Sequence, residues 1–196
     1  MAIKQILFNT EMVRAILDGK KSCTRRLVKH DVSAILNSPY HKEHPEVEDK
    51  QIITKLCLPP YQPGDTIYVR ETWCKDKYRY MYRANYSKNE KFYRGDVEEK
   101  VKWNPSIHMP KEAARIWLKV MDVRVERLQD ITSEQICKEG VEVEEPYVLN
   151  GEEKRYAFSN LWNSTIKKSD LDRYGWDANP WVWVIEFERC EKPEGV

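Results

Sequence analysis

The chain has 196 residues, of which 33% are charged, 41% hydrophobic and 11% aromatic. This length is enough for one domain with its own apolar core, and the composition excludes a collagen-like, low-complexity or wholly disordered protein. With 33 Lys and Arg against 32 Asp and Glu, the formal net charge is only +1. Any surface that binds nucleic acid must therefore be a local patch.

The cysteines indicate neither a metal site nor a disulfide framework. There are five of them, an odd number, with no C-x-x-C pair, and the four histidines form no ligand pattern with them. No apolar run approaches the roughly 20 residues of a membrane span, and the apolar N-terminal segment is too short for a signal peptide. We expect a cytoplasmic protein with free thiols, no metal, no cofactor and no membrane partner.

The first predicted elements are a short strand over 6–8 and a short helix. Asn9 is a good N-cap residue, and apolar residues then recur at helical spacing. Gly19 is suited to the left-handed conformation that ends a helix. The polar segment 30–60 is typical of a loop insertion, with a little helix over 32–36.

The rest of the chain alternates strands and short helices. The apolar face of the segment 114–128 slips by one residue, which is typical of a strand that bends in a barrel. The tryptophans at 162, 176, 181 and 183 are assigned to the core. The remaining predicted elements are a strand over 66–73, its hairpin partner over 78–84, a helix opened by the capping box 132–135, an acidic loop insertion near 142–155, a helix over 156–166 and a central strand over 181–187.

These elements predict the α+β class: a small mixed β-barrel with short helices packed around it. We expect one domain over 1–196, with loop insertions near 30–60 and 142–155.

A compact cationic segment follows the predicted helix stop. Residues 20–26 contain four cations, Lys20, Lys21, Arg25 and Arg26, and Gly19 lets the backbone turn sharply before them. Such a segment is suited to binding an anion. A solvated basic turn is the alternative, and composition alone favours it.

Glu71 is the second candidate. In regular strand geometry it shares one face with Ile67, Val69 and Trp73, so a carboxylate lies among apolar side chains. A buried, unpaired carboxylate is costly, so we expect Glu71 to be buried and paired, with Lys21 or Arg26 as natural partners. A structural ion pair and a functional carboxylate both fit this pattern.

The third candidate is the segment 75–94, which holds seven cations against two carboxylates. On the predicted strand its tyrosines fall on one face, with Arg79 and Arg83 on the other. Aromatic rings interleaved with cations suit single-stranded nucleic acid, and a hairpin with inward-packed tyrosines is the alternative. His108, a lone histidine between two prolines, either lines a pocket or is an ordinary loop residue.

Together these motifs resemble the ASCH family of the PUA-like superfamily. The family signature G-x-K-x-x-T-x-R is matched by Gly19, Lys21, Thr24 and Arg26. The similarity covers most of the chain outside the two insertions. Further segments resemble the small ASCH-type proteins of phages and prophages: 6–13, 63–65, 69–73, 105–110 and 179–184.

The resemblance implies a PUA-like β-barrel whose cleft faces nucleic acid or a modified nucleobase. Some ASCH proteins are amidohydrolases that deacetylate N(4)-acetylcytidine, and their catalytic lysine, threonine and glutamate would fall on Lys21, Thr24 and Glu71. Thr24 would then attack the acetyl carbonyl, Lys21 would accept the hydroxyl proton and Glu71 would protonate the leaving amine. Arg26 would orient Glu71 or a phosphate.

We therefore expect an ASCH protein that binds RNA or a modified nucleoside. The amidohydrolase is the alternative, followed by a metal-independent ribonuclease and a protein-interaction module. The base recognised, the choice between RNA and DNA, and the oligomeric state stay open. The expected catalytic residues are Lys21, Thr24 and Glu71, and the expected ligand-binding residues are Gly19, Lys20, Arg25, Arg26, Arg79, Arg83 and His108.

Overall fold

The computed structural model describes residues 2–87, 89–94, 97–142 and 152–195. They form two compact units, and neither is a continuous stretch of chain. The first unit comprises Met1–Lys21, Gly64–Lys119 and Glu188–Val196. The second comprises Ser22–Pro63 and Val120–Phe187.

The first unit is built on parallel pairing of β1 (Ile3–Leu7) with β3 (Thr66–Arg70), which places Ile6 opposite Val69. β3 also pairs antiparallel with the start of β8 (Trp117–Arg127). Apolar and polar residues alternate along β3, so that Ile67 and Val69 are buried. This unit also holds two hairpins, β4–β5 (Trp73–Lys75, Tyr80–Tyr82) and β6–β7 (Phe92–Arg94, Val97–Glu99).

Helix α1 (Thr10–Leu17) confirms the predicted first helix. The Asn9 side chain accepts a hydrogen bond from the Met12 amide, and Val13 and Ile16 are buried in the core. Gly19 has φ +72°, the left-handed conformation that a helix stop requires.

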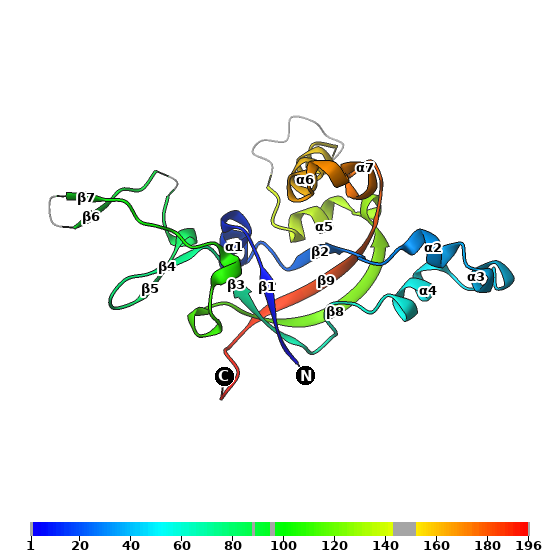
Figure 1. Ribbon diagram of the computed structural model, residues 1–196, viewed down its shortest axis with the longest axis horizontal. Helices are drawn as coiled ribbons and strands as arrows, with labels where there is room; N and C mark the ends of the chain where they lie inside the picture. Colours follow the sequence, from blue (N-terminus) through cyan, green and yellow to red (C-terminus); the bar gives the residue numbers. More distant parts are fainter. Residues whose placement is uncertain (1, 88, 95–96, 143–151, 196) are drawn as a thin grey trace. The chain divides into compact units, whose positions relative to one another are not determined.

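In the second unit, β2 (Cys23–Leu27) pairs antiparallel with β9 (Trp181–Cys190). Helices α5 (Ser133–Lys138) and α6 (Glu152–Thr165) lie over these strands (Figure 1). Apolar side chains from the strands and helices form one core that includes Cys23, Ile136 and Phe158. The predicted capping box is confirmed, because Thr132 and Gln135 each accept a hydrogen bond from the other's backbone amide.

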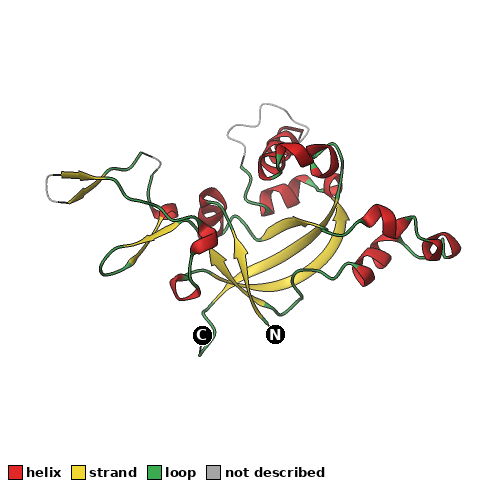
Figure 2. Ribbon diagram, in the orientation of Figure 1, coloured by secondary structure: helices red, strands yellow, loops and turns green. Residues whose placement is uncertain are grey.

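The α+β class is confirmed by a five-stranded sheet of order β1-β3-β8-β9-β2 and by several short helices (Figure 2). β9 is flanked by β8 and β2 and is buried on both faces along its first half, as predicted for a central strand. In β8 the buried positions change phase between Val120 and Val125, as the apolar pattern predicts. In this strand order β1 and β2 are the edge strands.

The predicted helix over 32–36 is confirmed as α2 (Val32–Leu36), but the loop prediction for the rest of 30–60 is wrong, because this segment also contains α3 (Pro39–Glu43) and α4 (Asp49–Leu56). Asp31 and Ser38 cap the first two helices with their side chains. Ile52 and Ile53 anchor α4 in the core. Because Ile52 and Ile53 are the buried residues of an otherwise polar helix, its sequence lacks the apolar periodicity that predicts a helix.

Two other boundaries differ from prediction. The predicted strand 66–73 breaks at Glu71, whose amide donates to the Met109 sulfur at 3.2 Å, and β4 begins only at Trp73. Of the predicted acidic insertion, 143–151 lie outside the described residues, and Glu152 already begins α6. None of the helices in the described part of the chain is both long and apolar enough to cross a membrane.

Candidate functional site

The predicted site residues are divided between the two units. Lys21 and Glu71 belong to the first unit, and Thr24 and Arg26 belong to the second. The geometry is therefore described for each unit separately.

In the first unit, the turn after α1 encloses Lys21. The amides of Lys20 and Lys21 both donate to the Ala15 carbonyl, at 2.8 and 3.0 Å. Lys20 is exposed, but Lys21 is only 4% exposed and its ammonium lies 5.5 Å from the Phe8 ring centroid. A solvated basic turn therefore describes Lys20 and not Lys21, since a buried ammonium needs compensating contacts such as the ring face.

In the second unit, β2 places Thr24 and Arg26 on one face, because side chains two residues apart in a strand point the same way. Arg26 Nη1 donates to Thr24 Oγ1 at 2.7 Å and to the Arg25 carbonyl at 2.9 Å. Burial lowers the pKa of Arg26, while the charges of Glu139 and Tyr61 act in the opposite direction. The pair thus joins a buried hydroxyl to a cation in a poorly solvated environment.

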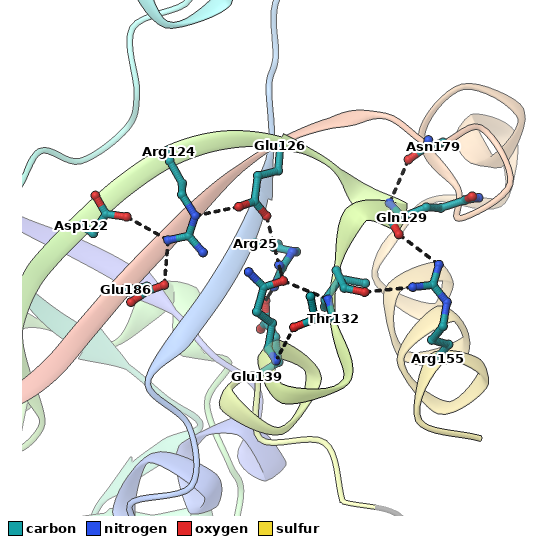
Figure 3. Close-up of polar contacts among 12 residues, drawn as sticks. Arg25, Asp122, Arg124, Glu126, Gln129, Thr132, Glu139, Arg155, Asn179 and Glu186 are labelled. Carbon is teal, nitrogen blue, oxygen red and sulfur yellow. Dashed lines mark hydrogen bonds and ion pairs between the residues drawn. The ribbon is translucent and has the colours of Figure 1, made fainter. Parts of the chain in front are cut away.

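Arg25 points to the opposite face and lies in an ion-pair network (Figure 3). Its Nη1 donates to Glu139 at 3.2 Å, and its Nη2 donates to Gln135 at 3.0 Å and to Glu126 at 3.4 Å. The side chains of Arg25 and Glu139 are 1% and 7% exposed. Arg25 was expected to bind ligand, but both of its Nη groups are occupied by protein acceptors.

The network extends to Arg124 on β8 (Figure 3). Arg124 Nε donates to Glu126 at 2.7 Å, and its Nη1 donates to Asp122 and Glu186 at 2.8 and 2.6 Å. Burial acts to lower the pKa of Arg124, but the hydrogen bonds to these three carboxylates outweigh it and raise that pKa. The cluster therefore connects β2, β8, β9 and α5 through arginines whose charges are balanced by carboxylates.

Glu71 is 0% exposed and paired, which confirms the prediction of a buried, paired carboxylate. Its partner among the described residues is Arg115, and not Lys21 or Arg26 as expected. Arg115 Nε and Nη2 donate to its two oxygens at 2.8 and 2.9 Å. The Arg115 guanidinium also lies 4.1 Å from the Tyr82 ring centroid, and its Nη1 donates to Asn85 at 2.8 Å. No motif singled out Arg115; the only signal was a cation flanked by apolar residues just before a long strand.

The β4–β5 hairpin carries an exposed cationic and aromatic surface. Lys75 lies 4.9 Å from the Tyr80 ring centroid, and Lys77 lies 5.4 Å from that of Tyr78. Tyr80 also contacts Trp73, with ring centroids 5.7 Å apart. Tyr78 is 85% exposed in the turn and lies outside β5. The prediction that it shares one strand face with the other tyrosines is therefore wrong.

Other predicted residues of this region are held by the protein. The Tyr82 hydroxyl donates to the Ala113 carbonyl at 2.7 Å. Arg83 Nη1 donates to the carbonyls of Tyr86 and Ser87, at 2.9 and 2.7 Å. Arg79 forms an exposed 3.8 Å pair with Asp76. His108 is exposed at the end of the short 3-10 helix Ser106–His108.

Within the described ranges, no three His, Cys, Asp or Glu side chains come together as a metal-binding group. All five cysteines are free thiols: Cys23, Cys57 and Cys74 are buried, Cys190 is half-buried and Cys137 is exposed.

The sequence matches no protein-family model and no curated protein. Among solved structures, it is similar to a crystal structure of an ASCH domain from Lactobacillus crispatus JV V101, at 10% identity and a TM-score of 0.40 over 96% of this chain and 79% of that one. It is also similar to a crystal structure of the hypothetical protein PH0355, at 16% identity and a TM-score of 0.38 over 97% of this chain and 100% of that one. Likenesses this low do not identify a family.

Proposed function

We propose that this protein binds RNA or a modified nucleoside, and that the β4–β5 hairpin is a contact surface for it. The observation that carries the proposal is Tyr78, an aromatic ring 85% exposed in a turn that also presents Lys75, Lys77 and Arg79. Exposed rings stack on unpaired bases, while neighbouring cations neutralise phosphates.

Among these cations, the one carboxylate of the hairpin turn pairs with Arg79 and with neither lysine. Asp76 Oδ1 accepts hydrogen bonds from the amides of Tyr78 and Arg79, at 2.7 and 2.8 Å. These two bonds lower the pKa of Asp76 and fix the turn. Among the described residues, neither Lys75 nor Lys77 has a carboxylate partner. The lysines are therefore available to phosphates.

Lys21, Thr24 and Arg26 add a second element to this proposal. Lys21 is enclosed in the first unit, and Thr24 and Arg26 form a hydroxyl–guanidinium pair in the second. We assign Lys21 in the first unit and, separately, the Thr24–Arg26 pair in the second to recognition of the base or its modification, because fixed donors and acceptors at low solvent exposure discriminate between base edges.

Fluorescence anisotropy with a labelled single-stranded oligoribonucleotide tests the hairpin. Tyr78→Ala should weaken binding by about 1–3 kcal/mol, the value of one stacked base. Lys77→Gln should reduce the slope of log affinity against log salt concentration by about 0.7, the value of one phosphate contact on a single strand. Tyr156→Ala, at an exposed tyrosine on α6, is the matched control. Salt-independent binding, or equal affinity for the Tyr78 and Tyr156 variants, would contradict the proposal.

One observation favours deacylation of an N(4)-acylated cytidine as a second candidate. The guanidinium of Arg26 donates to Thr24 Oγ1, and a cation at this position stabilises the negative charge that a nucleophilic hydroxyl develops. The acid role of Glu71 is less well supported, because both of its oxygens accept from Arg115.

Incubation with N(4)-acetylcytidine, followed by chromatography for cytidine, tests this candidate. Turnover that is lost in Thr24→Ala and Lys21→Ala but kept in Tyr78→Ala would establish the deacylase. Absence of turnover, with binding intact, would leave a protein that only binds. Shortening of the labelled oligoribonucleotide in the presence of EDTA would instead indicate the metal-independent ribonuclease.

A further inference from the structure

A cavity of about 390 Å³ in the second unit contains none of the residues discussed above as a site. Its volume lies within the range of small-molecule sites. It is lined by residues that follow β2, by α2, by the end of β8 and by α7 (Leu171–Tyr174) with the segment that leads from it into β9. The residues that matter for the argument are His30, Arg127, Arg173, Tyr174 and Trp181.

Both arginines of the cavity are without carboxylate partners among the described residues. The Arg127 guanidinium lies 4.4 Å from the Trp181 ring centroid, and one of its N–H groups donates to the Asn179 carbonyl at 3.0 Å. Arg173 lies 5.0 Å from the Tyr174 ring centroid. An arginine has five N–H donors, so both side chains keep donors for an anion.

A carboxylate of the cavity wall does not neutralise the arginines. The Asp31 side chain accepts from the Ala34 amide at 3.1 Å and caps α2. His30, an exposed residue next to it, adds a ring with two nitrogens that can form hydrogen bonds. The wall therefore favours an anionic ligand.

Trp181 supplies the second, independent observation. Its side chain is packed so that the residue is only 8% exposed, and its indole Nε1 has no hydrogen-bond partner among the described residues. A buried donor without a partner costs about 1–3 kcal/mol. Nε1 itself has almost no accessible surface, so a ligand acceptor in the cavity that Trp181 lines would remove this cost through a small rotation of the indole.

The position of Arg127 is fixed before any ligand binds. Asn179 adopts φ +45°, in the left-handed region, and its side chain accepts from the Gln129 amide at 2.8 Å. This conformation presents the Asn179 carbonyl to Arg127. Since the Trp181 ring holds the other side of the guanidinium, binding would cost little side-chain entropy.

We propose that this cavity binds a nucleoside monophosphate unit. Arg127 and Arg173 receive the phosphate, because planar guanidinium groups bind phosphate oxygens in pairs. The base lies against the aromatic wall, and Trp181 Nε1 donates to a ligand acceptor. The unit is either a free nucleotide or the 5′-terminal nucleotide of a strand, and this proposal does not depend on the β4–β5 hairpin or on Lys21.

The experiment is a titration of the full-length, ¹⁵N-labelled protein with uridine 5′-monophosphate, followed through its indole N–H resonances. The chain has seven tryptophans, and Trp181→Phe assigns the resonance of Trp181 by its disappearance. We expect this resonance to shift saturably. Arg173→Gln and Arg127→Gln should each weaken binding about tenfold or more, as expected for loss of a charge-assisted hydrogen bond. Arg189→Gln, at an exposed arginine outside the cavity, should leave binding unchanged.

Further ligands test each part of the proposed unit. Uridine and inorganic phosphate should each bind at least about tenfold more weakly than the nucleotide, because each lacks one half of the contacts. Tighter binding of a 5′-phosphorylated oligoribonucleotide than of its 5′-hydroxyl form would identify a strand end as the source of the ligand. Preference for the free nucleotide over both would identify a nucleotide site.

Three outcomes would overturn the proposal: no shift of the Trp181 resonance up to about 5 mM nucleotide, an equal affinity for inorganic phosphate, or an unchanged affinity in Arg173→Gln. Tyr78→Ala should not alter this titration. Failure here and failure of the hairpin proposal are therefore distinguishable.

Discussion

Arg124 and Arg127 lie three residues apart on β8, yet their guanidinium groups have different environments. An odd separation in a strand puts the two side chains on opposite faces. Arg124 donates to three carboxylates, and Arg25 on β2 donates to two. The charge of each of these arginines is therefore balanced by carboxylates of the protein. Within the described ranges, Arg127 contacts an aromatic ring and a carbonyl, and Arg173 contacts a ring without a carboxylate partner.

The difference shows what separates a structural arginine from one available to a ligand. Arg124 and Arg127 are both half-buried on β8, and neither residue type nor position along the strand distinguishes them. The difference is that Arg124 already has carboxylate partners, so it has little to gain from binding an anionic ligand, whereas Arg127 has none among the described residues. Substitution of Arg25 or Arg124 should therefore mainly lower the stability of the protein. Substitution of Arg127 or Arg173 should mainly weaken ligand binding.

The largest effect on stability is expected for Arg25→Ala. It takes one cation away from two carboxylates, Glu126 and the 7% exposed Glu139, and removal of one partner of a buried pair costs about 3–5 kcal/mol. Urea denaturation measures the free energy of unfolding. A loss below about 1 kcal/mol would show that the network is not a structural cluster and would remove the contrast between the two faces.

A smaller loss is expected for Glu71→Gln, the pair that is buried at one end only. Arg115 keeps 25% of its side chain exposed, so water replaces part of what the carboxylate supplied. We expect a decrease of about 1.5–3 kcal/mol, the range for hydrogen bonds to a charged group. The same denaturation experiment on Arg115→Gln should give a similar or larger decrease in the free energy of unfolding, because that change removes the cation paired with the buried Glu71. A clearly smaller decrease would contradict this geometry.

Still smaller effects are expected in the cavity. Arg127→Ala removes one ring contact and one hydrogen bond and should cost about 0.5–1 kcal/mol. Arg173→Ala should lie within about 0.5 kcal/mol of the parent protein. A decrease of several kcal/mol in the free energy of unfolding of Arg173→Ala would mean that this arginine is structural. It would contradict the distinction drawn between Arg173 and Arg25.

The smallest effect concerns alkaline pH. Burial raises the pKa of Tyr82, the nearby Arg115 acts to lower it, and Glu71 and Tyr80 add to the increase. The phenol therefore ionises in the unfolded chain first, and the free energy of unfolding should decrease as pH rises above about 10, the ordinary tyrosine value. Tyr82→Phe should make that decrease shallower, and an unchanged slope would show that the ring is not protected from solvent.

Local signals predicted the elements that local physics determines. Asn9 and Gly19 delimit α1, and the capping box at Thr132 opens α5, because a cap depends only on residues within one turn. Within 30–60, α2 was predicted but α3 and α4 were missed, and α4 is held by tertiary docking of Ile52 and Ile53 rather than by a periodic pattern.

The sites were less predictable because they depend on distant residues. Burial of Glu71 followed from the alternation of its strand, but its partner Arg115 is 44 residues away. Trp181 was correctly assigned to the core, yet the same residue lines a cavity with Arg127 and Arg173, which no sequence motif connects. Strand periodicity predicts that a side chain points inward; it does not predict what that side chain meets there.

The division of the chain into interleaved units also bears on inheritance. The first unit contains both ends of the chain, and β8 and β9 each run from one unit into the other. A single genetic crossover anywhere between residues 22 and 187 would therefore split the first unit. The two units cannot be exchanged between proteins as cassettes, so the hairpin of one and the cavity of the other must be passed on together, as parts of a single reading frame.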